Sequence, residues 1–197
     1  MSVEELAPGL RRWTARHEEW RDDVASLAVQ TRDGLVLIDP LDPPPELRSP
    51  QHVLLTVPYH ERSTRSVHAK HVWAGQRAVR SLANRGIAVT DVASPDAALP
   101  GGIRVFQTAR PAEVAYWLPE QRSVVVGDVL LAAGARPRPT DDPLRLCPER
   151  WLGKATHDDL RESLAPLLEL PVERVLVAHG KPVLRDGLRE LERVLAK

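Results

Sequence analysis

Three apolar runs of this chain each end in polar residues of the kind that bind metal ions or take part in catalysis. The runs cover residues 53–55, 123–127 and 174–178. They lead into a cluster from Thr56 to Ser63, into Asp128 and into His179. Short apolar runs of this length are typical of buried strands, and polar groups at strand ends meet at one edge of a layered fold. We therefore expect Thr56, Asp128 and His179 to lie close together.

The order of the remaining segments indicates the fold class. Asp33-Gly34 separates two β-type runs and is a strong hairpin signal. Further strands are predicted at 72–74, 87–89, 103–106, 114–118 and 124–126, and helices at 63–70, 77–85, 157–168 and 184–196. This order predicts an α/β protein, an αββα sandwich, in which two mixed β-sheets pack face to face with helices on both outer sides. A chain of 197 residues is long enough for one domain, which we expect to cover 1–197.

Composition excludes several classes of partner. The 27 basic and 27 acidic residues give no net charge, so we expect no nucleic-acid or membrane partner. No apolar run approaches the roughly 18 residues of a membrane span, and the start of the chain is acidic, which predicts a cytoplasmic protein. The lone Cys147 excludes an internal disulfide and a cysteine-rich zinc site. A small molecule is the expected ligand.

In their order, these segments resemble the metallo-β-lactamase-fold superfamily. Similar segments are the opening 3–13, the strand 34–40, the motif region 53–63, the hairpin 114–128 and the last element 175–183. The resemblance covers nearly the whole chain, and it implies an αββα fold that carries a metal-dependent hydrolase site. This chain differs from the family in the family's most diagnostic motif, T-H-x-H-x-D-H.

Placing Thr56 on the threonine of that motif shows the departure. Val57 and Tyr59 then stand at the first two histidines, Glu61 at the aspartate and Arg62 at the third histidine. Valine cannot ligate a metal, and a cationic arginine opposes one. An alanine, Ala109, stands at the next histidine position, so the three-histidine half of the family's site reads Val57, Tyr59 and Ala109 and is lost.

The other half of the implied site is partly retained. Asp128 and His179 match the family outright, and Glu61 is a conservative replacement. One Zn or Fe ion held by Glu61, Asp128 and His179 is one possibility. The other, which we expect, is that no metal cofactor binds and that Arg62 pairs with Asp128 or Glu61 in its place.

Two functions follow from this degenerate metal site. The first is a pseudoenzyme that lacks two-metal hydrolysis and binds a small metabolite or a partner in the retained pocket. The alternative is a single-metal or metal-free hydrolase of a small ester, thioester or lactone. The candidate catalytic residues are His60 as general base, Arg62 as oxyanion stabiliser, and Glu61. The expected pocket residues are Tyr59, Asp128, Cys147 and His179.

Two histidines have open alternatives. His60 is either a substitute metal ligand or a loop histidine that is exposed or bonded to the backbone. His179 is either a metal ligand or a buried histidine hydrogen-bonded to Asp128.

Overall fold

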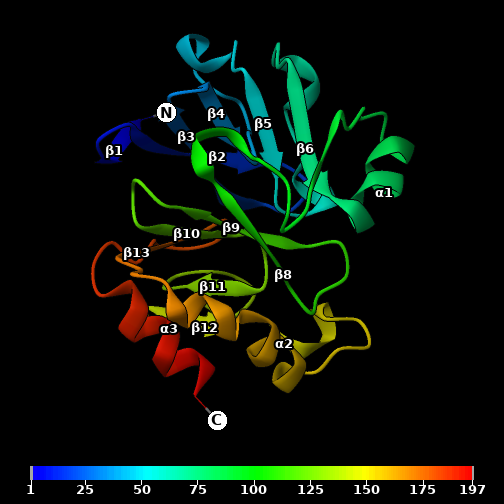
Figure 1. Cartoon of the computed structure of the whole chain (residues 1–197). Helices are drawn as coiled ribbons and strands as arrows, with labels where there is room; N and C mark the ends of the chain where they lie inside the picture. Colours follow the sequence, from blue (N-terminus) through cyan, green and yellow to red (C-terminus); the bar gives the residue numbers. More distant parts are fainter. Residues whose placement is uncertain (1, 197) are drawn as a thin grey trace.

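Two β-sheets lie against each other in the computed structural model, which describes residues 2–196 (Figure 1). The first sheet has seven strands in chain order: β1 (Val3–Ala7), β2 (Leu10–His17), β3 (Asp22–Thr31), β4 (Gly34–Ile38), β5 (His52–Leu55), β6 (His71–Gly75) and β7 (Asp91–Ala93). Strands β1 to β4 pair antiparallel, and β4 to β7 pair parallel. The sheet is therefore mixed, as predicted.

The second sheet follows in the chain and is also mixed. Its strands are β8 (Arg104–Gln107), β9 (Val114–Leu118), β10 (Ser123–Val126) and β13 (Arg174–Val177), in the order β13-β10-β9-β8. Strand β13 pairs parallel with β10, whereas β8, β9 and β10 pair antiparallel. A short hairpin of β11 (Leu130–Ala132) and β12 (Leu144–Leu146) stands apart from both sheets.

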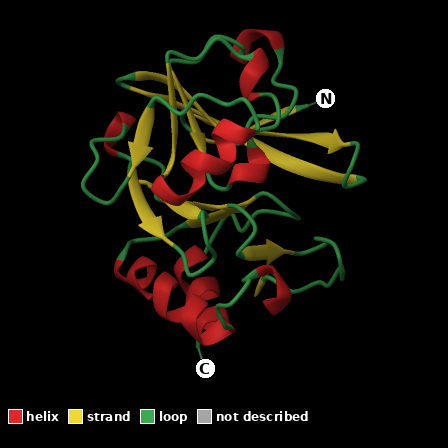
Figure 2. Cartoon of the chain, turned by 90° about the vertical axis from the view of Figure 1, so that its right-hand side faces the viewer, coloured by secondary structure: helices red, strands yellow, loops and turns green. Residues whose placement is uncertain are grey.

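Helices cover the outer sides of this pair of sheets (Figures 1 and 2). The helix α1 (Val79–Asn84) lies beside the first sheet, and α2 (His157–Leu164) and α3 (Gly187–Leu195) lie below the second. Alternate residues of one strand face different layers. Val36 and Ile38 pack with Tyr116 between the sheets, while Leu37 packs outward in a cluster with Leu82 of α1. The αββα prediction is confirmed.

The layer below the second sheet is the largest apolar cluster. Val124 and Val126 of β10 pack there with Leu160 of α2 and Leu191 of α3. Thr156 begins α2 with a capping box, because its side chain and that of Asp159 each accept a hydrogen bond from the other's backbone N–H.

Several predicted elements differ from the structure. Residues 63–70 form only the short 3₁₀ turn Thr64–Ser66, since hydroxyl groups such as that of Ser66 bond the local backbone and compete with a helix. No strand forms at 87–89, where Ile87 packs into the outer cluster; the strand is β7 at 91–93. The predicted helix 157–168 becomes 3₁₀ after Leu164, where Pro166 removes a backbone donor.

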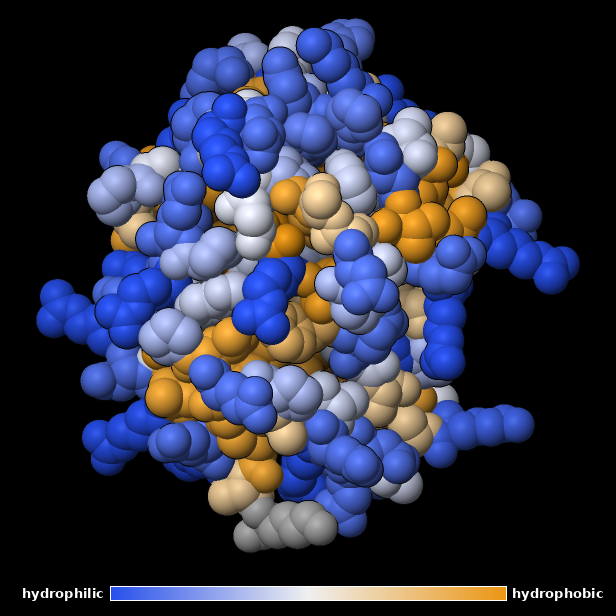
Figure 3. All heavy atoms as spheres, viewed as in Figure 1, coloured by the Kyte–Doolittle hydropathy of each residue, from blue (hydrophilic) through white to orange (hydrophobic). Residues whose placement is uncertain are grey.

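On the face drawn in Figure 3, hydrophilic side chains predominate, and hydrophobic ones show in groups between them. Large hydrophobic side chains that are clearly exposed include Tyr59, Val92 and Leu184. Within residues 2–196, no helix has the length and apolar character needed to cross a membrane.

Candidate metal centre

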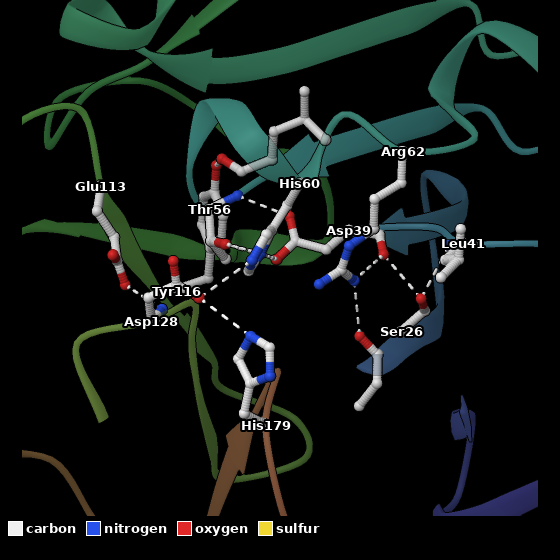
Figure 4. Close-up of polar contacts among 12 residues, drawn as sticks. Ser26, Asp39, Leu41, Thr56, His60, Arg62, Glu113, Tyr116, Asp128 and His179 are labelled. Atoms are coloured by element: carbon white, nitrogen blue, oxygen red, sulfur yellow. Dashed lines mark hydrogen bonds and ion pairs between the residues drawn. The ribbon is translucent and has the colours of Figure 1, made fainter. Parts of the chain in front are cut away.

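Side chains that follow four strands form one buried polar cluster. Asp39 follows β4, Thr56 follows β5, and Asp128 and His179 follow β10 and β13. Both strand pairs are parallel, so their carboxyl ends lie at the same edge of each sheet. Figure 4 shows these side chains directed toward one another, which confirms the predicted convergence of Thr56, Asp128 and His179.

His60 occupies the centre of the cluster. It ends the 3₁₀ turn Pro58–His60, which brings its ring into the interior, where it is fully buried. Its Nδ1 lies 2.8 Å from Oδ2 of Asp39, and its Nε2 lies 3.2 Å from Oδ1 of Asp128. Thr56 fixes Asp39, because its backbone N–H donates to Oδ1 at 2.9 Å and its hydroxyl to Oδ2. His60 is therefore neither exposed nor bonded to the backbone through its ring.

His179 repeats this arrangement from the other sheet. Its Nδ1 lies 3.2 Å from Oδ2 of Asp22, and its Nε2 lies 3.3 Å from the same Oδ1 of Asp128. Each imidazole thus has one nitrogen held by a carboxylate and the other directed at a shared oxygen. Metal-binding histidines have this pattern, since a carboxylate on Nδ1 fixes the tautomer and leaves Nε2 to ligate.

Arg110 is the internal cation of the site. Its Nη1 donates to Oδ2 of Asp128 at 2.6 Å and to Oε2 of Glu113 at 2.7 Å. Glu113 is itself buried, and its Oε1 accepts the backbone N–H groups of Asp128 and Val129. These contacts fix the Asp128 carboxylate with one oxygen on the arginine and the other facing the two imidazoles.

The expected role of Arg62 as that cation is wrong. Its Nη1 donates instead to the backbone carbonyls of Ala25 and Asp39, at 3.0 and 2.9 Å, as Figure 4 shows for Asp39. Glu61 is also directed elsewhere, since its Oε1 accepts from Arg85 at 3.1 Å. The reason is local: Arg62 has a φ of 34°, and this left-handed turn changes the direction in which the neighbouring side chains leave the backbone.

The pKa values of the cluster follow from burial opposed by charge. Burial and the nearby Arg62 disfavour the charged form of His60, but Asp39 and Asp128 outweigh them and raise its pKa. Burial likewise opposes protonation of His179, yet hydrogen bonds to Asp128 and Asp22 raise its pKa to about 9. Burial opposes ionisation of Asp128, but the surrounding cations hold its pKa well below the usual range. Without a metal, these contacts therefore favour the protonated form of both imidazoles beside the ionised Asp128.

The charges of the cluster balance in two ways. With all four ionised, the carboxylates of Asp22, Asp39, Glu113 and Asp128 exceed the two guanidinium groups of Arg62 and Arg110 by two negative charges. Two imidazolium groups neutralise this excess. One divalent cation with both imidazoles neutral neutralises it equally, so the same framework suits a protonated and a metal-bound state.

The donor set fits one metal ion. His60, Asp128 and His179 each offer a ligand atom, and these atoms lie within 4.8 Å of one another. Nε2 of His60 and Oδ1 of Asp128 are buried and have no hydrogen-bond partner of good geometry, although they face each other. Two nitrogens and one carboxylate oxygen are ligands that zinc accepts in catalytic sites, which keep a fourth position open. Glu61, a predicted ligand, is replaced by His60 in this triad.

A pocket of about 390 Å³ opens beside the triad. Its lining residues are Trp20, Asp22, Tyr59, Arg110, Asp128, Arg136, Pro137, Trp151 and His179. Trp20 comes from the turn between β2 and β3, and its ring centroid lies 5.9 Å from that of His60 and 6.0 Å from that of His179. The predicted pocket residues Tyr59, Asp128 and His179 are all present.

Cys147 lies outside this pocket, so its predicted place there is wrong. It lines a neighbouring cavity of about 270 Å³, and its side chain is buried in the apolar layer below the second sheet. Burial raises the pKa of its thiol to about 12, which keeps the thiol protonated and unreactive at neutral pH.

Sequence reasoning missed Asp39, Asp22, Glu113 and Arg110. Asp39 carried a usable signal, since it ends the apolar run 35–38 as Asp128 ends its own. Nothing local marked the others. Asp22 reaches His179 across 157 residues of chain, and Arg110 reaches Asp128 across 18.

Comparison with known proteins identifies the fold and goes no further. No family model matches the sequence, and no curated protein matches it. Solved structures do match over nearly its whole length. A metallo-β-lactamase from Pontibacter korlensis is 17% identical, with 98% of each chain covered and a TM-score of 0.66.

Two further neighbours agree. The metallo-β-lactamase FIM-1 from Pseudomonas aeruginosa, in its mono-zinc form, is 13% identical, with 98% of this chain and 94% of that chain covered and a TM-score of 0.66. A metallo-β-lactamase family protein from Thermus thermophilus is 16% identical, with 96% of this chain and 80% of that chain covered and a TM-score of 0.62. The chain has the metallo-β-lactamase fold.

Proposed function

We propose that this chain uses its metallo-β-lactamase fold to hold one divalent transition-metal ion, zinc or iron, and to hydrolyse a small ester, thioester or lactone. The ligands are His60, Asp128 and His179. One observation carries the proposal: two buried imidazoles, each with Nδ1 held by a carboxylate, direct Nε2 at the same oxygen of Asp128. The mono-zinc form of the Pseudomonas aeruginosa neighbour supports a single ion as an occupancy compatible with this fold.

When bound, the ion would supply Lewis acidity, which favours water activation and carbonyl polarisation. The chain's own groups prepare the site for it. Asp39 and Asp22 keep the proton on Nδ1 of each imidazole, so that Nε2 is a free acceptor. Arg110 occupies Oδ2 of Asp128 and leaves Oδ1 available, so the carboxylate is presented in one orientation.

The pocket walls determine which molecules reach the site. Trp20, Tyr59 and Trp151 give it aromatic sides, and a volume of about 390 Å³ suits a small organic molecule. Aromatic walls reduce the water around a bound carbonyl group and strengthen its interactions with charged groups. Tyr59 lines the pocket and is 48% exposed, and the guanidinium carbon of Arg85 lies 4.8 Å from the centroid of its ring.

The proposal is tested by metal content and hydrolysis together. Untagged protein would be loaded with zinc, desalted and analysed for metal, and then assayed with p-nitrophenyl acetate, a thioester and a lactone. We expect about one zinc per chain and zinc-dependent turnover. His60→Asn and His179→Asn should abolish both. His68→Asn, which alters an exposed histidine outside the cluster, is the matched control and should change neither. Parent protein that retains no zinc would overturn the proposal, and about two zinc ions per chain would contradict the one-ion site.

A second candidate function is binding without hydrolysis. The charge balance of the cluster favours it. When both imidazoles are protonated and Arg110 is paired with Asp128, the cluster is neutral without a metal ion. In that case, zinc loading should leave the melting temperature unchanged, while a small ligand of the pocket should raise it by mass action.

A further inference from the structure

A second cavity of different character has one lining residue, Pro137, in common with the pocket beside the triad. Its volume is about 270 Å³. Its other lining residues are Arg138, Thr140, Arg145, Leu146, Cys147, Pro148, Arg150 and His157. Arg136 lines the first pocket, directly across Pro137 from Arg138 in the chain. We call this second cavity, with Arg136 at its junction, the arginine groove.

The arginine groove is cationic although the chain as a whole is neutral. Arg138, Arg145 and Arg150 line the second cavity, and no aspartate or glutamate does. Asp141 lines a different cavity, beside the start of α3. Within the described residues, none of the four arginines 136, 138, 145 and 150 lies within 4.0 Å of a carboxylate oxygen. These arginines thus form no ion pair in the described part of the chain, although Arg136 is attracted over a longer distance by Asp22.

Hydrogen bonds to the backbone hold part of the groove in one conformation. Nη2 of Arg145 donates to the backbone carbonyls of Ala135 and Arg138, at 2.7 and 2.8 Å, and so holds the loop that carries Arg136 and Arg138. The ring of His157 contacts the carbonyl of Cys147 at 2.8 Å through Nε2, which fixes the opposite wall. Nε of Arg145 and Oγ1 of Thr140 are buried without a hydrogen-bond partner. Both belong to residues that line the cavity, so the described part of the protein leaves polar groups of the groove's own residues without a partner.

From these observations, we propose that the arginine groove binds a phosphoryl group of the substrate. The substrate is then a phosphorylated small molecule whose ester, thioester or lactone carbonyl reaches the triad. Several guanidinium groups around one cavity match the several oxygens of a phosphate or diphosphate, with which arginine forms paired hydrogen bonds. A single carboxylate would leave most of these donors unused. This inference rests on the proposed function for the carbonyl end only, because none of the proposed metal ligands His60, Asp128 and His179 lines the groove.

The test uses inorganic pyrophosphate as a probe, with the full chain freed of metal by a chelator and then desalted. Removing metal first prevents pyrophosphate from binding to an ion at the triad. Calorimetric titration should show one site whose affinity falls as salt is added. The double variant Arg138→Gln/Arg150→Gln should weaken binding by about tenfold. Arg80→Gln, an exposed arginine of α1 outside any ion pair within residues 2–196, is the matched control and should bind like the parent.

Each outcome decides the inference. No binding, or equal binding by the parent and the double variant, would overturn it. Equally tight binding of a single-stranded oligonucleotide at the same arginines would also overturn it, since the groove would then serve a polymer. In zinc-loaded protein, a phosphorylated ester should show a KM lowered by about tenfold relative to its unphosphorylated form, and the double variant should remove that difference. If zinc is not retained but pyrophosphate binds as expected, the proposed hydrolysis fails while the phosphoryl site stands.

Discussion

Replacing Arg110 by methionine isolates the contribution of the internal cation. Methionine keeps most of the apolar stem but leaves the buried carboxylates of Asp128 and Glu113 without the guanidinium they share. Removing one partner of a buried ion pair typically costs about 3–5 kcal/mol, because the other charge remains uncompensated. The pKa of Glu113 is already raised, chiefly by burial and by Asp128, so this residue can take up a proton and relieve part of the cost. We therefore expect the lower end, about 3 kcal/mol.

Chemical denaturation measures this loss directly. Urea unfolding of chelator-treated protein, followed by circular dichroism at pH 7, should show the loss as a lower midpoint at an unchanged slope. The melting temperature should fall by about 6–12 °C, given about 2–4 °C per kcal/mol for a chain of this size. The difference from the parent should shrink at pH 5, because protonation of Glu113 then becomes easier.

A surface ion pair provides the matched control. Arg16 lies 3.6 Å from Asp23, and both side chains are more than half exposed. Arg16→Met should change the free energy of unfolding by less than about 0.5 kcal/mol. If Arg110→Met unfolds within about 1 kcal/mol of the parent at pH 7, then Arg110 does not compensate the buried carboxylates, and our account of the cluster's charge balance is wrong.

Three further predictions concern pH, the outer carboxylate and the helix cap. In metal-free protein the pKa of His179 is raised to about 9, so its stabilisation is complete below about pH 6.5 and is lost as the pH rises through 9. Urea midpoints across this range should fall in the parent and fall much less in His179→Asn. Asp22→Asn should weaken zinc binding by about tenfold in a competition titration with a chromophoric chelator, because Nδ1 of His179 loses its carboxylate; unchanged affinity would exclude that role. Thr156→Ala should lower the free energy of unfolding by about 1 kcal/mol in urea, since the capping box of α2 is lost; an unchanged midpoint would show that the cap contributes little.

Much of the fold was predictable because its signals are local. The hairpin at Asp33-Gly34 forms between β3 and β4, and the apolar runs become strands with Asp128 and His179 at their carboxyl ends. Alternation along a strand and the length of an apolar run depend on neighbouring residues, which the sequence displays. The predicted helix at 63–70 failed because hydroxyl groups competed for the backbone, a balance that apolar periodicity does not record.

The candidate site was predictable only in part. Asp128 and His179 were identified, and both belong to the triad that could hold a metal. The motif alignment assigned the third ligand to Glu61, but the 3₁₀ turn that begins at Pro58 brings His60 inward in its place. A shift of one residue in such a turn exchanges the side chain that faces the interior for one that faces away, and spacing alone does not reveal the turn's torsions.

By itself, the sequence determined most of the strands and the polar residues that end them. Only the tertiary structure decided the partners of those residues. Arg110, and not Arg62, neutralises Asp128, and Asp22 from the β2–β3 hairpin holds His179 of the opposite sheet. Strand formation depends on short-range alternation. The pairing of buried charges depends on which side chains the packed sheets bring within a few ångströms in a medium of low dielectric, and this is established only once both sheets are in contact.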